Sequence, residues 1–142
     1  MKSRTKARIA ALQTLYEVDL TNHPLGVVLQ ERAEDNQLDQ AEYEFAQQIA
    51  QGVYDNKKRM DELIAKHAPE WPLDQVAIID RNIIRIALWE VAIYRKTPLK
   101  VGINEAVELA KTFGTDSSSR FINGVLGGLV ENLEDLKQAL SQ

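Results

Sequence analysis

The side chains best suited to binding chemistry in this 142-residue chain are four cations at its start, Lys2, Arg4, Lys6 and Arg8. They precede the first acidic residue, Glu17, although the whole chain carries a net charge of −4. Cations gathered on an acidic chain can hold phosphates locally while the remaining surface repels polyanions. Four charges are few, so a solubilising terminus is the alternative interpretation. The charge pattern therefore leaves phosphate binding and simple solvation both open.

A second group of candidate residues lies in the last third of the chain, where two expected helices are joined by a polar turn. Gly114 is expected to end the first of them, and residues 116–119 carry side chains suited to capping the second. Arg120 and Phe121 stand together at the start of that second helix. An exposed ring beside a cation suits an unpaired RNA base, because the ring stacks on the base and the cation holds a phosphate. Core packing is the alternative for Phe121, and equally for Tyr16.

Catalytic and metal chemistry find little support in the residue types. The chain has no cysteine, which excludes disulfides and thiolate metal sites, and it has two histidines. Neither His23 nor His67 follows a carboxylate at the spacing used by di-iron helices, and glycine-rich phosphate-binding motifs are absent from the sequence. Glu105 and Glu108 resemble paired acids, but Lys111 follows three residues later, which favours surface ion pairing. We predict no catalytic residue, no metal site and no cofactor.

Hydrophobic periodicity predicts an all-α fold of about seven helices, with no sustained strand pattern. The expected helical segments are residues 3–20, 25–34, 39–67, a short turn at 73–77, 80–95, and two helices on either side of Gly114. The tail, residues 134–142, is expected either to add a short helix or to fray. Glu42 follows Asp39 by three residues, which is the spacing of a capping box at the start of the long helix. That helix is expected either to be continuous or to break near residues 55–56.

Two prolines divide the pattern. Pro69 and Pro72 mark a seam between an N-terminal group of three helices, about residues 1–68, and a C-terminal group, about residues 73–142. Short connections between helices of this length imply antiparallel neighbours. We therefore expect two packed helical subdomains that form one domain, residues 1–142.

Glycines and tryptophans are assigned to packing. Gly124 and Gly128 lie four apart inside an expected helix, where each glycine costs up to about 1 kcal/mol. Close approach of another helix would offset that cost, so we expect a close helix contact there. Trp71 and Trp89 are assigned to the core or to the seams between helices.

The compartment also follows from composition. The most apolar segment, residues 83–94, carries two charged side chains and is too short to span a bilayer. The start of the chain has basic residues but no apolar segment of a signal peptide. Together with the absence of cysteine, this predicts a cytoplasmic protein with no membrane contact.

Three blocks of sequence lie in order along nearly the whole chain. They are RIAALQTLYE (8–17), DRNIIRIALWE (80–90), and INEAVELAK followed by a Ser-rich turn and FINGVL (103–126). Together they resemble the NusB family of bacterial transcription antitermination factors. The resemblance implies a NusB-like all-α fold and a protein that is not an enzyme.

The resemblance also implies partners. Members bind the boxA element of nascent single-stranded RNA as a heterodimer with NusE, a small-subunit ribosomal protein that doubles as an elongation factor. This complex joins NusA and NusG on RNA polymerase and prevents premature termination, notably in ribosomal RNA operons. Some members self-associate, so a homodimer that covers the RNA surface is a further implied state.

The family's RNA contacts match eight positions of this chain: Lys2, Arg4, Lys6, Arg8, Tyr16, Asp80, Arg120 and Phe121. Among them, Asp80 would accept a hydrogen bond from a base amino group. The basic motif departs from the Arg-rich family version, because Thr5 and Ala7 interrupt it, so we expect weak and salt-dependent affinity for RNA alone. In the turn, many members carry an acid just before the serine. Here Asp116 is followed by Ser117, so the resemblance leaves the register of that contact open.

Two other functions stay open from the sequence. NusB-like domains also serve RNA methyltransferases, but this chain carries no methyl-donor motif. A helical protein-interaction module without an RNA role, for example a homodimer, would use the same fold. An enzyme ranks last because the sequence offers no catalytic site.

Overall fold

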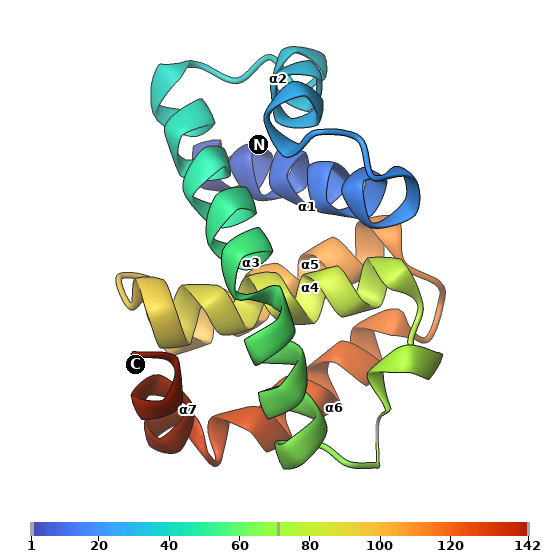
Figure 1. The fold of residues 1–142 in the computed structure, drawn as a ribbon, viewed down its shortest axis with the longest axis vertical. Helices are drawn as coiled ribbons and strands as arrows, with labels where there is room; N and C mark the ends of the chain where they lie inside the picture. The colour runs from blue at the N-terminus through green and yellow to red at the C-terminus, as the bar shows by residue number, and fades with distance from the viewer. Residues whose placement is uncertain (1, 71, 142) are drawn as a thin grey trace. The chain divides into compact units, whose positions relative to one another are not determined.

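The computed structural model describes residues 2–70 and 72–141, and all regular structure in these residues is helical (Figure 1). The α-helices are α1 (Ser3–Thr21), α2 (Leu25–Asp35), α3 (Gln40–His67), α4 (Ile78–Leu88), α5 (Leu99–Phe113), α6 (Ser118–Val130) and α7 (Leu133–Leu140). A 3-10 turn, Leu73–Gln75, precedes α4, and π-helical turns, Trp89–Tyr94, follow it. The prediction of an all-α fold with about seven helices is confirmed. No helix among the described residues is long and apolar enough to cross a membrane.

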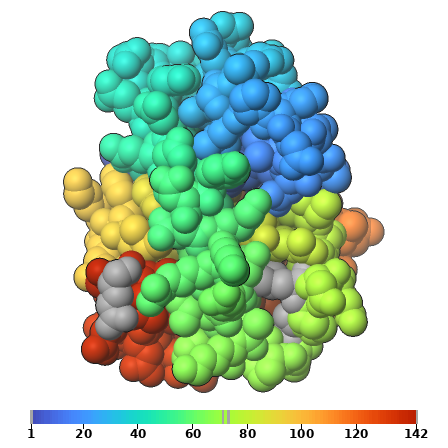
Figure 2. Space-filling model, viewed as in Figure 1, coloured from blue at the N-terminus to red at the C-terminus, as the bar shows by residue number. Residues whose placement is uncertain are grey.

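Backbone contacts group the chain into two compact units, residues 1–55 and residues 56–142. The division falls inside α3, which is one continuous helix through residues 55–56. The first unit therefore holds α1, α2 and the first part of α3, and the second holds the remaining elements. Figure 2 shows side chains of α3 at the surface along much of its length, as expected for a helix with one solvated face.

In the first unit, α1 packs against α2, and α3 begins with a capping box. The backbone N–H of Glu42 donates to Oδ1 of Asp39 at 2.8 Å, and the N–H of Asp39 donates to Oε1 of Glu42 at 2.8 Å. This reciprocal pair satisfies two backbone donors that a helix start otherwise leaves without partners. The capping box predicted from the sequence is confirmed. The main buried apolar side chains of this unit are Ala7, Ala10, Leu12, Val28, Leu29, Phe45 and Ile49.

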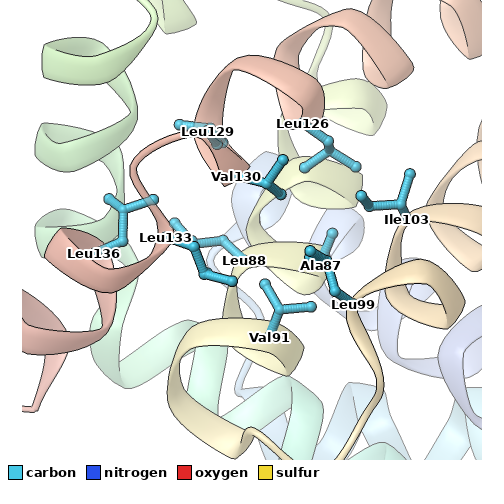
Figure 3. Close-up of a pocket in the computed structure, with 10 residues that line it drawn as sticks. All are labelled: Ala87, Leu88, Val91, Leu99, Ile103, Leu126, Leu129, Val130, Leu133 and Leu136. Atoms are coloured by element: carbon cyan, nitrogen blue, oxygen red, sulfur yellow. The ribbon is translucent and has the colours of Figure 1, made fainter.

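In the second unit, α4, α5 and α6 pack against one another, and α7 packs on the π-helical turns. Apolar side chains from α4, α5, α6 and α7 converge on one small gap, which Figure 3 shows. Its volume is about 10 Å³, no more than one water molecule would occupy. This part of the core is therefore closely packed and has no room for a ligand.

A partly buried ion pair joins α4 to the second part of α3. Arg85, on α4, donates from Nε to Oδ1 of Asp61 at 2.8 Å and from Nη2 to Oδ2 at 2.6 Å. Its Nη1 donates to Oδ1 of Asn82 at 3.1 Å. A two-pronged contact of this kind is geometrically specific. It therefore helps to set the position of the first turn of α4, which carries Asp80.

The helix expected to run from residue 80 to 95 changes its form before it ends. After Leu88 the backbone continues as π-helical turns, and Arg95 ends them in the left-handed conformation with φ of 67°. The N–H of Arg95 donates to the carbonyl of Glu90, five residues back, at 2.9 Å. Glu90 is fully buried, and its Oε1 accepts from Oγ1 of Thr97 at 2.8 Å. The wider turns thus accompany a buried carboxylate that the periodicity did not indicate.

The predicted close contact at Gly124 and Gly128 is wrong for the described structure. A Cβ atom added at either glycine would have no described atom within 4 Å beyond the helix itself. Close approach occurs instead at Gly114, where an added Cβ would lie 2.8 Å from the carbonyl oxygen of Ala110 and would collide with the side chain of Ser118. Trp89 is buried, as assigned, and its ring stacks on that of Tyr94. Trp71 lies outside the described residues.

Candidate nucleic-acid interface

Two arginines of the basic start are directed at one aromatic ring. The guanidinium carbon of Arg4 lies 3.9 Å from the centroid of the Phe45 ring, and that of Arg8 lies 5.4 Å from it. Cations at these distances are attracted to the ring face. Arg4 remains exposed, but Arg8 is only 3% exposed. Arg8 therefore contributes to the packing between α1 and α3, which limits its reach toward a phosphate.

Lys6 has partners inside the protein. Its Nζ donates to the carbonyl oxygen of Gln37 at 3.3 Å and lies 3.6 Å from Oε1 of Glu42. The Lys6 side chain is 28% exposed, whereas that of Glu42 is 7% exposed. The amide of Asp39 holds the pKa of Glu42 below its ordinary value, with further lowering from the Ser3 hydroxyl and the Lys6 charge against an opposing effect of burial. Glu42 is therefore an ionised partner for Lys6 at neutral pH.

Tyr16 lies on α1, about two turns beyond Arg8. Its neighbours on the expected apolar face, Leu12 and Leu15, are buried, but Tyr16 is 38% exposed. The tyrosine ring therefore reaches solvent in the same unit as the basic start. Exposure of this kind is what a base-stacking ring requires.

Asp80, in the first turn of α4, is buried, and only one of its two oxygens has a partner among the described residues. Its Oδ2 accepts from Oγ of Ser118 at 3.1 Å, while no described residue donates to Oδ1. Burial raises the pKa of Asp80 above its ordinary value, and the Ser118 hydroxyl offsets part of that rise. A buried acceptor without a donor is costly and uncommon, so Asp80 is a candidate for an interaction beyond those of the described residues.

An open cleft of about 370 Å³ lies beside this carboxylate. Asp80, Ser117 and Phe121 line it, together with Glu70, Pro72, Gln75, Val76 and Ala77. Phe121 is half-buried, and its neighbour Arg120 is exposed. A ring and a hydrogen-bond acceptor in one cleft form the combination that stacks and reads an unpaired base.

Ser118 is the site residue that sequence reasoning missed. It was expected to cap α6, but no side chain caps that helix, and its N-cap position is Ser117. The Ser118 hydroxyl instead accepts from the N–H of Thr115 at 2.9 Å and donates to Asp80. Gly114 is the one sequence signal near this arrangement, because only a residue without a side chain leaves room for Ser118.

The predicted residues thus form one group in each unit. The first unit carries Lys2, Arg4, Lys6, Arg8 and Tyr16, and the second carries Asp80, Arg120 and Phe121. The expected surface ion pair is confirmed, since Nζ of Lys111 lies 3.4 Å from Oε1 of Glu108. Within the described residues, no cluster of three His, Asp or Glu side chains could hold a metal ion.

Comparisons with known proteins agree with this picture. The model of the NusB family matches residues 5–131. The transcription antitermination protein NusB of Chloroflexus aggregans is 46% identical over 129 residues, which cover 89% of this chain and 86% of that protein. The solved structure of T. maritima NusB is 28% identical with a TM-score of 0.80 and covers 95% of this chain and 90% of that chain. A crystal structure of antitermination factors NusB and NusE in complex with dsRNA contains a chain that shares the fold, with 24% identity, a TM-score of 0.81 and 98% coverage of both chains.

Proposed function

Because this chain belongs to the NusB family, whose members are RNA-binding antitermination factors and not enzymes, we propose that it binds boxA RNA together with NusE. In this role it supports transcription of ribosomal RNA operons in the cytoplasm. The larger complex contains NusA, NusG and RNA polymerase. These finer assignments rest on the family resemblance, and the site geometry supports RNA as the ligand.

The observation that carries the proposal is the cleft beside Asp80. The Oδ1 atom of Asp80 has no donor among the described residues, and Phe121 offers a half-buried ring in the same cleft. Exocyclic amino groups of adenine, cytosine and guanine are hydrogen-bond donors, and the Asp80 carboxylate that lines the cleft offers such a group an acceptor. Stacking on Phe121 would hold the base in place. This cleft therefore supplies base recognition.

The start of α1 supplies the second part of the function. Lys2, which precedes α1, and Arg4, on its first turn, are exposed, so they can reach phosphate oxygens. Each phosphate neutralised on a single strand adds about 0.7 to the slope of log affinity against log salt. Base contacts in the cleft and phosphate contacts at the start of α1 thus make different, separable contributions to affinity.

The test is a fluorescence-anisotropy titration of a short boxA RNA and a scrambled RNA of equal length. Each is measured with and without NusE, at two salt concentrations. We expect tighter binding to boxA than to the scrambled RNA, with the preference increased by NusE. Equal affinity for the two RNAs in the presence of NusE would refute the proposed function.

A homodimer is the alternative state, and its proposed effect is to cover the RNA surface. Sedimentation of the protein across a range of concentrations, with and without boxA RNA, measures it. RNA that shifts a dimer toward monomer would support that competition. A monomer at all concentrations would exclude it.

A further inference from the structure

We propose that Glu42 is an internal competitor for Lys6, so that the basic start of α1 offers RNA fewer cations than its sequence contains. The Glu42 carboxylate pairs with the Lys6 ammonium group, which would otherwise be available to a phosphate. This inference rests on the proposed RNA-binding function and assigns Glu42 a role in it. Nothing in the charge pattern of α1 alone indicates the competition, because Glu42 lies on a different helix.

The competing contact is built into the start of α3. Oε1 of Glu42 accepts from the N–H of Asp39 at 2.8 Å and lies 3.6 Å from Nζ of Lys6. The same ammonium donates to the carbonyl of Gln37 at 3.3 Å. The capping box holds the Glu42 carboxylate in position beside Lys6, so pairing with Lys6 costs little additional side-chain entropy. An acceptor that is already positioned competes well with a mobile phosphate.

The burial of the two partners strengthens the competition. Glu42 is 7% exposed and keeps its charge, while Lys6 is 28% exposed. A phosphate that approaches Lys6 must either displace a fixed carboxylate or lie beside its negative charge. Both alternatives weaken phosphate binding at Lys6. With Arg8 buried, the exposed cations of this segment are Lys2 and Arg4.

Substitution Glu42→Gln separates charge from structure. Glutamine also fits the third position of a capping box, so its side-chain oxygen can still accept from the N–H of Asp39. Glu44→Gln is the matched control, because it makes the same change in net charge on an exposed residue two positions further along α3. The Gln40 amide that donates to Glu44 at 3.1 Å would keep its acceptor in that control.

The experiment measures binding of each variant to a scrambled single-stranded RNA as a function of salt. We expect Glu42→Gln to tighten binding about two- to fivefold at low salt and to steepen the salt slope by about 0.7. Glu44→Gln should leave the slope unchanged. In a Lys6→Gln background, Glu42→Gln should have no effect. Equal effects of Glu42→Gln and Glu44→Gln, or an effect that persists without Lys6, would overturn the inference.

Two further measurements keep this test separate from that of the proposed function. Salt elution from heparin reports the same cation without any RNA, so later elution of Glu42→Gln supports the inference even if boxA preference is absent. Conversely, if the protein prefers boxA but Glu42→Gln elutes at the same salt concentration as the parent, the inference is wrong and the proposed function is supported. If Glu42→Gln fails to fold, the single variants decide: Lys2→Gln should lower the salt slope by about 0.7 and Lys6→Gln by much less.

Discussion

Glu42 and Asp80 are both buried carboxylates beside residues matched to RNA contacts, but their surroundings differ. Glu42 lies near a lysine and accepts from a backbone amide. Asp80 has a serine hydroxyl on one oxygen and no described donor on the other. The pKa of Glu42 is accordingly lowered, while burial raises that of Asp80. The fold therefore favours the ionised form of the first carboxylate and disfavours that of the second.

Glu42 has the surroundings of a structural carboxylate, and Asp80 those of a binding carboxylate. The hydrogen bonds of Glu42 and the Lys6 charge favour its ionised form and outweigh the opposing effect of burial, so this carboxylate stabilises the junction of α1 and α3. Asp80 lines an open cleft, and its buried Oδ1 has no donor among the described residues, which costs stability. Both carboxylates are buried, so the difference between their roles comes from the groups beside them: a lysine and a backbone amide for Glu42, and a serine hydroxyl for Asp80.

The largest expected effect is a loss of RNA affinity, and it should differ between a base contact and a phosphate contact. Phe121→Ala should weaken boxA binding about fivefold to a hundredfold, because stacking a base on an aromatic ring is worth about 1–3 kcal/mol. The salt slope should not change, since no cation is removed. Lys2→Gln should weaken boxA and scrambled RNA alike and lower the slope by about 0.7. Anisotropy titrations at several salt concentrations measure both quantities.

Circular dichroism of the two variants is the control for this comparison, because a misfolded Phe121→Ala protein would lose affinity for a trivial reason. The comparison fails if a folded Phe121→Ala protein binds boxA as tightly as the parent. It also fails if Lys2→Gln changes affinity for boxA only.

Gly114→Ala tests the packing that holds Ser118 against Asp80. The added Cβ would lie 2.8 Å from the carbonyl oxygen of Ala110 and collide with Ser118. We expect a loss of about 1–3 kcal/mol in the free energy of unfolding, as for other overpacked sites. Urea denaturation measures the loss, and unchanged stability would show that the turn adjusts without cost.

Opposite pH dependence should distinguish the two carboxylates. The stability that Glu42 contributes is present above its ordinary pKa of 4.5 and is lost as pH falls through its lowered pKa in the fold. Asp80 has its pKa raised from 3.8, so the folded state loses stability as pH rises from 3.8 through the raised pKa.

Unfolding free energies of the parent, Glu42→Gln and Asp80→Asn between pH 3 and pH 7 measure this contrast. The advantage of the parent over Glu42→Gln should shrink on acidification. Relative to Asp80→Asn, the parent should lose stability as pH rises, because asparagine removes the buried charge and can still accept from Ser118. Parallel curves for all three proteins would contradict the contrast.

The smallest expected effect is a gain in stability from Gly124→Ala. An added Cβ there meets no described atom within 4 Å, and alanine is the better helix former by up to about 1 kcal/mol. Thermal unfolding measures the gain, with Gly114→Ala as the substitution of the same type at a crowded position. A destabilised Gly124→Ala protein would mean that the α6 glycines serve a contact beyond the described residues.

Much of the fold was predictable from local rules. Apolar periodicity located seven helices, and the spacing of Asp39 and Glu42 predicted a capping box that the structure confirms. The serine run of the turn is less informative. Its residues suit a helix cap, but Ser118 instead bonds to Asp80, 38 residues away in the sequence. A hydroxyl fits several partners, and the sequence does not indicate which one the fold brings near.

The candidate site divides in the same way. The sequence by itself determined the all-α class, the cations at the start and the blocks that resemble the family, because each depends on residue type and short spacing. Only the tertiary structure decided that Lys6 faces Glu42 and that Arg8 is buried. It also decided that Asp80 lines a cleft with Phe121 and that its Oδ1 has no donor among the described residues. Burial and charge pairing depend on which side chains, far apart in the sequence, come into contact, and the packing of the helices determines those contacts.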